Sequence, residues 1–455
     1  MRTAVEMARA VREREVSPVE LVEDALRRAD AWQPVTNAFS QLHAEEALAE
    51  ARRKSEDVAS ERDLGPLHGV PVAVKDLFDV AGWETTGCCE AYRGRPAERD
   101  AEAVRRLRAA GAVIVGKTNQ HELAAGATNL ISACGATRNP WDPSRITGGS
   151  SGGSGAAVAA GVVPVALGTD TGGSIRIPAS MCGVSGLKPT HGSISLEGVM
   201  PLAPSLDTVG PLARTGEDCA VLLSVLGGDP AIGAEVGGPL GDLTVGSLGT
   251  LYVAFLHREV LDASLAAVDV FGELGAVTTG VLGEGTFAPE VWEEIAWPEL
   301  AQHHGGLLDR RDLLHDRTAE LLARGAGQPE EVMAEARRRA AEVREAFLSA
   351  LTVVDVLLAA ATPIVAPPAG ADWVEVGSGR VSVRHGAPSL LTRSVNLAGL
   401  PAMAVPGGFS SDGLPIGIQL IGRPGEEAVL LRAARAFQGA TDHHRAEPEL
   451  PTGSG

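Results

Sequence analysis

The chain contains few cysteines and few aromatic residues, and it lacks a long uninterrupted apolar run. Five cysteines in 455 residues do not make a disulfide framework, and Cys88-Cys89 has no spaced cysteine or histidine partner for zinc. Glycine, proline or charge interrupts each apolar stretch before the ~20 residues that span a bilayer. The N-terminus carries Glu6 early and lacks the apolar segment of a secretory signal. We therefore expect a soluble cytoplasmic protein with no membrane segment and no metal site.

The chain also has fewer basic than acidic residues. Its 58 acidic and 39 basic residues give a net charge of -19, which repels the phosphates of nucleic acids. The basic run 337–339 alternates with Glu335 and Glu342, as is typical of a solvated helix face. The P-loop pattern G-x-x-x-x-G-K-[ST] is absent. We expect no nucleic-acid partner and no cofactor.

Helical and strand patterns alternate along the chain, which favours the α/β fold class. A capping box, Ser17-Pro18-Val19-Glu20, predicts a helix over residues 18–31. The same criteria predict helices at 3–15, 44–62, 100–110, 290–304 (broken or kinked at Pro298), 312–324, 330–351 and 425–437. Strands are predicted at 69–75, 112–115, 162–167, 355–359, 402–405 and 416–421. We expect helices on both faces of a largely buried sheet.

Two glycine-serine clusters lie close together, at residues 148–155 and 168–176. Composition alone favours a flexible linker for the first cluster, but its apolar flanks at 156–160 and 162–167 argue against that interpretation. In the second cluster, adjacent glycines allow backbone N–H groups to converge on one point, which suits an oxyanion. A tight turn is the commoner structure for such a pair. Together the clusters indicate a serine-based active site.

A nucleophilic serine needs a base, and histidine is the usual one. His121 and His191 are the nearest histidines, but neither lies in a G-x-S-x-G pattern, and a lone histidine is more typical of a structural role. Lys75 ends an apolar strand, where burial lowers a lysine pKa of about 10.4 by roughly 3 to 5 units and so produces a base. A strand-end lysine that reaches solvent is the equally open alternative. The pairs His303-His304 and His443-His444 are more typical of solvated residues than of ligands.

Taken together, these segments resemble the amidase signature family of serine hydrolases. The resemblance covers essentially the whole chain and rests on residues 69–76, 148–155, 168–178, 182–190, 396–401 and 413–422. It implies a single large α/β/α sandwich with a central mixed, twisted sheet covered by helices. Residues 1–450 would form one amidase domain, with a signature core at about 65–215 and a helical substrate-covering region at about 286–350. Residues 451–455 would be a tail or a cloning remnant.

The resemblance also implies a triad of Ser, cis-Ser and Lys. It assigns the nucleophile to Ser174, the bridging serine to Ser150, after a cis peptide, and the base to Lys75. The implied oxyanion donors are the backbone N–H groups of Thr171, Gly172, Gly173 and Ser174. The residues implied to hold these loops are Ser151, Asp170 and Arg176.

Family members differ in what surrounds the triad. The glutaminase subunit of tRNA-dependent amidotransferases typically carries glutamine just after Ser-Ile-Arg, where this chain has Ile177, and the segment 245–285 is shortened here. We therefore expect a serine amidohydrolase that acts on a small-molecule amide, with aryl amides and carbamates (urethanes) as options. The glutaminase subunit is the alternative, and a non-catalytic scaffold that retains the fold is the alternative of another class. Trp292 and Trp297 either cover the acyl pocket or belong to the core, and a homodimer is an open option.

Overall fold

The computed structural model describes residues 2–60, 64–227, 239–384 and 386–450, and eleven of the described strands form one mixed sheet. In spatial order these are β1 (Phe39–Leu42), β3 (Val113–Thr118), β2 (Pro71–Lys75), β4 (Val165–Thr169), β6 (Val209–Ala213), β5 (Ser185–Lys188), β12 (Ala402–Phe409), β13 (Pro415–Ile421), β9 (Val356–Ala360), β7 (Thr244–Leu248) and β8 (Val277–Val281). Strand β2 is parallel to β3 and β4, and β7 is parallel to β8 and β9. The pairings from β4 across to β9 are antiparallel. A separate two-stranded ribbon joins β10 (Trp373–Val376) to β11 (Gly379–Ser382).

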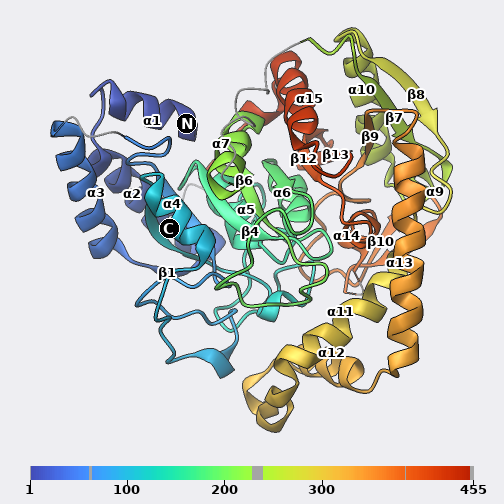
Figure 1. Cartoon of the computed structure of the whole chain (residues 1–455), viewed down its shortest axis with the longest axis horizontal. Helices are drawn as coiled ribbons and strands as arrows, with labels where there is room; N and C mark the ends of the chain where they lie inside the picture. Colours follow the sequence, from blue (N-terminus) through green and yellow to red (C-terminus); the bar gives the residue numbers. More distant parts are fainter. Residues whose placement is uncertain (1, 61–63, 228–238, 385, 451–455) are drawn as a thin grey trace.

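Helices flank the sheet along the whole chain (Figure 1). The described α-helices are α1 (Ala4–Arg12), α2 (Pro18–Thr36), α3 (Ala44–Ala59), α4 (Glu102–Ala109), α5 (Gly152–Ala159), α6 (Arg176–Cys182), α7 (Gly216–Gly227), α9 (Thr250–Val253), α10 (Arg258–Glu273), α11 (Pro289–His304), α12 (Asp316–Ala326), α13 (Glu330–Ala350), α14 (Arg393–Leu397) and α15 (Glu427–Ala440). The short 3₁₀ helices are η1 (Glu90–Tyr92), η2 (Glu122–Ala124), η3 (Gly305–Leu313), η4 (Ala387–Ser389) and η5 (His443–Arg445). Helices α11, α12 and α13 form a group at one end of the molecule (Figure 1).

Alternate residues of β2 show that both faces of the sheet are covered. Val72 and Val74 belong to a core cluster that includes side chains of α4, α7, α10 and α15. Ala73, between them, belongs to a second cluster with side chains of α2, α3 and α5. Successive side chains of a strand point to opposite faces, so each face of β2 packs against a different helix layer. The expected α/β sandwich with a mixed sheet is confirmed.

Most predicted elements are present, with shifted ends. The capping box forms as predicted, since the Ser17 side chain accepts the N–H of Glu20, but helix α2 continues to Thr36, beyond the predicted end at residue 31. The strand predicted at 162–167 begins only at Val165, because Pro164 cannot donate to a strand ladder. The helix predicted at 312–324 begins at Asp316, since Gly305–Leu313 is a 3₁₀ helix.

Other boundaries also differ. Helix α11 continues through Pro298, so of the two predicted outcomes, a break or a kink, the break is wrong. The helix predicted at 44–62 ends at Ala59, and residues 61–62 lie outside the described residues. Strands β5 and β6 were not predicted, because glycine and proline interrupt their short apolar patterns. None of the described helices is long and apolar enough to cross a membrane.

Candidate active site

Two neighbouring strands end at the same edge of the sheet and bring Lys75 and Thr169 together. Strand β2 ends at Lys75, and its parallel neighbour β4 ends at Thr169. The Lys75 Nζ donates to Ser150 Oγ at 2.7 Å and to Thr169 Oγ1 at 2.8 Å. Ser150 lies in the loop before α5, and neither it nor Lys75 has any exposed surface. Two of the three predicted triad residues are therefore in direct contact.

The burial of Lys75 has the largest effect on its pKa. Desolvation lowers the pKa of Lys75 to about 7, although the nearby carboxylates of Asp207 and Asp170 act in the opposite direction. The alternative of a strand-end lysine that reaches solvent is wrong. Near neutral pH a substantial fraction of Lys75 is uncharged, and only the uncharged amine accepts a proton.

The backbone around Ser150 adopts the arrangement that the resemblance implied. The Gly149–Ser150 peptide bond is cis. The Ser150 carbonyl accepts the backbone N–H of His121 at 3.1 Å. Ser150 is thereby tied to the segment that follows β3.

Ser174 lies at the wall of a cavity of about 600 Å³. Its residue exposure is 8%, and its hydroxyl has no hydrogen-bond partner among the described residues, Ser150 included. The Ser174 carbonyl accepts the backbone N–H of Ser151 at 3.2 Å, which links the two glycine-serine clusters directly. The Ser174 hydroxyl is thus an unpaired group at the cavity wall.

The loop 171–174 corrects one predicted oxyanion donor. Gly173 donates its N–H to Asp170 Oδ1 at 2.8 Å and is not available to a substrate. The N–H groups of Thr171, Gly172 and Ser174 have no acceptor among the described residues. The carbonyls of this loop are held on its other side, because Thr171 accepts from Trp292 Nε1 at 2.7 Å and Gly172 from Thr392 Oγ1 at 2.6 Å.

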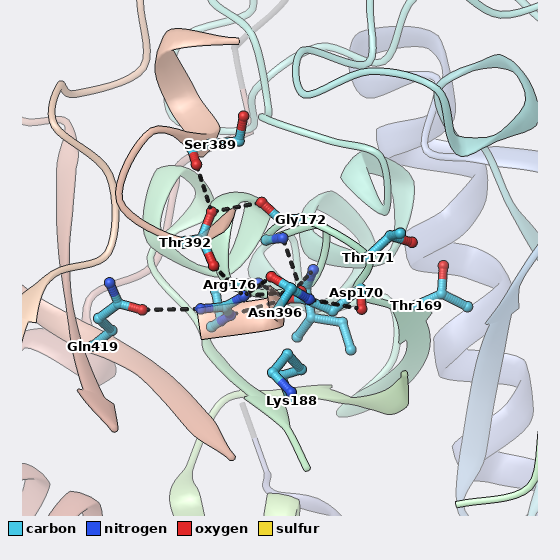
Figure 2. Close-up of polar contacts among 12 residues, drawn as sticks. Thr169, Asp170, Thr171, Gly172, Arg176, Lys188, Ser389, Thr392, Asn396 and Gln419 are labelled. Atoms are coloured by element: carbon cyan, nitrogen blue, oxygen red, sulfur yellow. Dashed lines mark hydrogen bonds and ion pairs between the residues drawn. The ribbon is translucent and has the colours of Figure 1, made fainter. Parts of the chain in front are cut away.

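A buried ion pair lies under the same loop (Figure 2). Arg176 Nη2 is 3.0 Å from Asp170 Oδ1, and both side chains are fully buried. Burial raises the pKa of Asp170, but Arg176 outweighs it, so the pKa lies below its usual range. Arg176 also donates to Asn396 Oδ1 at 2.6 Å and to Gln419 Oε1 at 3.1 Å. These contacts join the loop to α14 and β13.

Ser151 makes the remaining predicted loop contacts. Its Oγ donates to the Thr169 carbonyl at 3.2 Å and accepts the Thr169 N–H at 3.3 Å. Sequence reasoning assigned no role to Thr169, Thr392, Asn396 or Gln419. Asn396 and Gln419 lie in segments that carried the family resemblance, which was a usable signal. Thr392 had no local signal at all.

The cavity wall combines the N-terminal loops with the helices after residue 286. Trp292 and Trp297, from α11, line it and are each 5% exposed, with ring centroids 5.0 Å apart. Both tryptophans also belong to a hydrophobic core cluster, and their role as a cover of the acyl pocket stays a prediction. Arg393 lies 4.7 Å above the Trp292 ring and pairs with Glu293 at 3.0 Å. The wall also includes Ala124, Ala125, Ala127, Leu130, Ile131, Ile177 and Leu202.

His304 and His191 have structural contacts. His304 was expected to be solvated but is 4% exposed, with Nδ1 2.7 Å from the Tyr92 hydroxyl and Nε2 2.8 Å from the Pro201 carbonyl. His191 Nε2 lies 3.1 Å from the Pro204 carbonyl. Within the described ranges, no three histidine, cysteine or acidic side chains cluster as metal ligands would.

Comparisons with known proteins extend over nearly the whole chain. The family model described as Amidase matches residues 20–267 and 305–431. The chain is 39% identical to the A subunit of glutamyl-tRNA(Gln) amidotransferase from Chloroflexus aurantiacus, over 96% of each chain. Further relatives with that name come from Roseiflexus, Carboxydothermus hydrogenoformans and Burkholderia pseudomallei, at 36–39% identity.

Solved structures have the same fold. One belongs to an inhibitor-bound vestigial protein complex tied to the origins of an s-triazine catabolic enzyme, with a TM-score of 0.91, 36% identity, and coverage of 96% of this chain and 98% of that one. Another is 6-aminohexanoate cyclic dimer hydrolase with its substrate, with a TM-score of 0.86, 31% identity and coverage of 99% of each chain. The similar proteins therefore include both hydrolases and amidotransferase subunits.

Proposed function

The chain belongs to the amidase family, and on that premise we propose that it is a serine amidohydrolase that cleaves a C–N bond of a small amide. The contact between Lys75 Nζ and Ser150 Oγ, at 2.7 Å, is the observation that carries the proposal. It pairs a hydroxyl with a buried amine whose pKa is lowered to about 7 by desolvation. Ser174 lies at the cavity wall, and its carbonyl accepts the backbone N–H of Ser151, the residue after Ser150.

The proposed reaction passes protons along this pair. Ser174 turns its hydroxyl toward Ser150, which accepts that proton and gives its own to uncharged Lys75. The Ser174 oxygen attacks the substrate carbonyl. The resulting oxyanion accepts hydrogen bonds from the free N–H groups of Thr171, Gly172 and Ser174. The proton returns through Ser150 to the departing nitrogen, which leaves an acyl-enzyme. Water attacks the acyl-enzyme by the same route and releases the acid.

The cavity supports an uncharged acyl group. Ile177 and Leu202 give the wall an apolar surface, and Trp292 adds an aromatic one. The charged residues Arg393 and Glu293 in the wall pair with each other. We propose small amides as substrates, with aryl amides and carbamates as the variants to test. The helical residues 286–350 would act as the substrate cover of a single domain.

A glutaminase subunit is the second candidate, and the names of the curated relatives favour it over the first. Against it stands Ile177, which lines the cavity where the glutaminase subunit typically carries glutamine. Free glutamine also carries two charged groups, whereas Glu293 is already paired with Arg393 and Arg324. The two candidates share the proposed acyl-enzyme chemistry and differ in substrate and in the need for partner subunits.

A hydrolysis panel with the purified chain separates the candidates. Aliphatic amides, anilides, carbamates and glutamine are each assayed for amine or ammonia release, with Ser174→Ala as control. Turnover of simple amides without other subunits supports the amidohydrolase. Glutamine hydrolysis that requires added amidotransferase subunits supports the second candidate. No reaction of Ser174 with phenylmethylsulfonyl fluoride, together with no turnover, would indicate a non-catalytic scaffold.

A further inference from the structure

His121 forms part of the cavity wall, and the proposed reaction does not use it. It lies between β3 and η2, is 4% exposed, and lines the cavity that holds Ser174. Its backbone N–H donates to the Ser150 carbonyl at 3.1 Å. The backbone of His121 is therefore hydrogen-bonded directly to the bridging serine.

The surroundings of the ring fix where its proton lies. Burial lowers the pKa of His121 to about 3, and His315 and Lys75 nearby act in the same direction, so the ring is neutral at pH 7. The Nδ1 atom accepts the backbone N–H of Asn129 at 3.2 Å. A neutral imidazole whose Nδ1 is an acceptor carries its single proton on Nε2.

The Nε2–H group has no partner among the described residues. The neighbouring wall residue is Gly126, where an added Cβ would lie 2.3 Å from Nε2, so any side chain there would displace the ring. Because His121 lines the cavity and this N–H is unpaired, it is available to a ligand that supplies an acceptor. The cavity is where such an acceptor would come from.

We propose that His121 determines substrate specificity by donating Nε2–H to an oxygen of the bound amide, an oxygen other than that of the scissile carbonyl. The inference rests on the proposed amide-hydrolysing function. It names the substrate class as amides that carry a second, hydrogen-bond-accepting oxygen, such as a ketone, ester or carboxamide.

The charges around His121 favour an uncharged acceptor over a carboxylate. Neutral His121 supplies a dipole but no compensating charge. On the same wall Arg317 pairs with Glu320 at 3.1 Å and Arg393 pairs with Glu293 at 3.0 Å. Asp316 adds a negative side chain to the lining. Arg384, the third arginine of the lining, pairs with Asp372. A carboxylate that enters the cavity would therefore have to compete with an existing partner for each arginine of the described lining.

Matched substrates and variants test the proposal. The substrates are the 4-nitroanilides of hexanoic acid and of its 3-oxo, 4-oxo and 5-oxo derivatives, which move one acceptor along the acyl chain. His121→Asn retains an acceptor for the Asn129 N–H but lacks the Nε2 donor, and His121→Gln restores an N–H near that position. His191→Asn is the control, because His191 lies outside the cavity lining.

We expect wild-type kcat/KM to favour one oxo substrate over the hexanoyl compound by about threefold to tenfold, mainly through KM. His121→Asn should bring that ratio to about one, and His121→Gln should restore part of it, while His191→Asn keeps the wild-type ratio. If no oxo substrate is preferred, or if His121→Asn keeps the preference, the proposal is overturned.

Binding separates this inference from the proposed function. The same four anilides are titrated into Ser174→Ala and into the double variant Ser174→Ala/His121→Asn, with calorimetry as the readout. A binding preference that disappears with His121 supports the inference even if the wild-type chain does not hydrolyse anilides. Equal binding of all four compounds to both proteins would rule it out independently of turnover.

Discussion

Two regions of the chain meet at the loop 170–176, and they contribute different things. Residues 75–174 supply the groups proposed to react, namely Lys75, Ser150 and Ser174. Residues 389–419 supply groups that touch the loop only from outside: Thr392 bonds the Gly172 carbonyl across 220 positions, and Gln419 bonds Arg176 across 243 positions. The first region supplies the groups proposed to react, and the second region holds the loop in position.

The contacts of each region show why this division is physical. A carbonyl that is hydrogen-bonded on one side of a peptide plane directs the N–H of the same plane to the other side. Trp292, which lies outside both regions, holds the Thr171 carbonyl, and the same peptide plane carries the Gly172 N–H, which has no acceptor among the described residues. Thr392 holds the Gly172 carbonyl, whose plane carries the Gly173 N–H that Asp170 accepts, so Thr392 fixes the position of the loop and does not orient a free donor directly. Substitutions in the first region should therefore abolish the reaction, and those in the second should weaken it by shifting the loop that carries the donors.

The largest effect is expected for Ser174→Ala. Removal of the nucleophile should lower kcat by about 10⁴-fold or more, because the remaining donors and base cannot form an acyl-enzyme. The thermal midpoint should stay near the wild-type value, since the hydroxyl has no hydrogen bond among the described residues to lose. Amide turnover and thermal unfolding are the measurements. Unchanged turnover would contradict the proposal that the first region supplies the nucleophile.

Lys75→Met is expected to have the next largest effect. Methionine fills the lysine volume without a proton acceptor, so kcat should fall by about 10²- to 10⁴-fold, the range of general-base catalysis. Because Lys75 is fully buried and makes hydrogen bonds only to two hydroxyls, folding should survive the change. A variant that unfolds but regains wild-type turnover when stabilised would mean that Lys75 is structural.

A smaller and graded effect is expected from pH. Desolvation lowers the pKa of Lys75 from 10.5 to about 7, so the amine is protonated and inactive below pH 7 and uncharged above it. We expect kcat/KM to fall about tenfold per unit below pH 7 and to level off above. Lys188 is a necessary control, because desolvation lowers its pKa to about 7 as well. Lys188→Met should keep the wild-type pH dependence of kcat/KM. If that dependence disappears in Lys188→Met, the titration belongs to Lys188 and not to Lys75.

The reactive groups of the first region could be predicted from the sequence, because they lie in local sequence patterns. Glycines and serines at 148–155 and 168–176, and an apolar strand that ends in Lys75, are visible without a structure. Even here one detail failed. Gly173 is not a free donor, since Asp170 turns its carboxylate back to that N–H, and the orientation of Asp170 depends on Arg176, Asn396 and their tertiary packing.

The contacts of the second region could not be predicted, although Asn396 and Gln419 lie in segments that carry the family resemblance, because those contacts depend on how distant strands and helices pack. Thr392 lies in an ordinary stretch, and only the fold brings it to Gly172. The same reason explains His304, which a polar local sequence placed in solvent and which the fold buries against Tyr92 and Pro201. Local patterns identified reactive groups, whereas contacts across more than 200 positions left no periodic signal.

Thr392→Val gives the smallest of the expected effects and the sharpest test of the comparison. Valine keeps the shape of threonine but removes the hydroxyl that donates to the Gly172 carbonyl at 2.6 Å. We expect kcat to fall about tenfold with KM nearly unchanged, because the oxyanion forms only in the transition state. Thr392→Ser keeps the hydroxyl and should restore most of kcat. If both variants lose activity equally, or if KM rises while kcat is kept, then Thr392 acts through packing or substrate contact, and the second region does not align the donors.

Because Thr392 is fully buried, the thermal unfolding of both variants must be measured together with their kinetics. A loss of kcat in the valine variant at equal stability, with kcat restored in the serine variant, would identify the lost hydrogen bond to the loop as the cause.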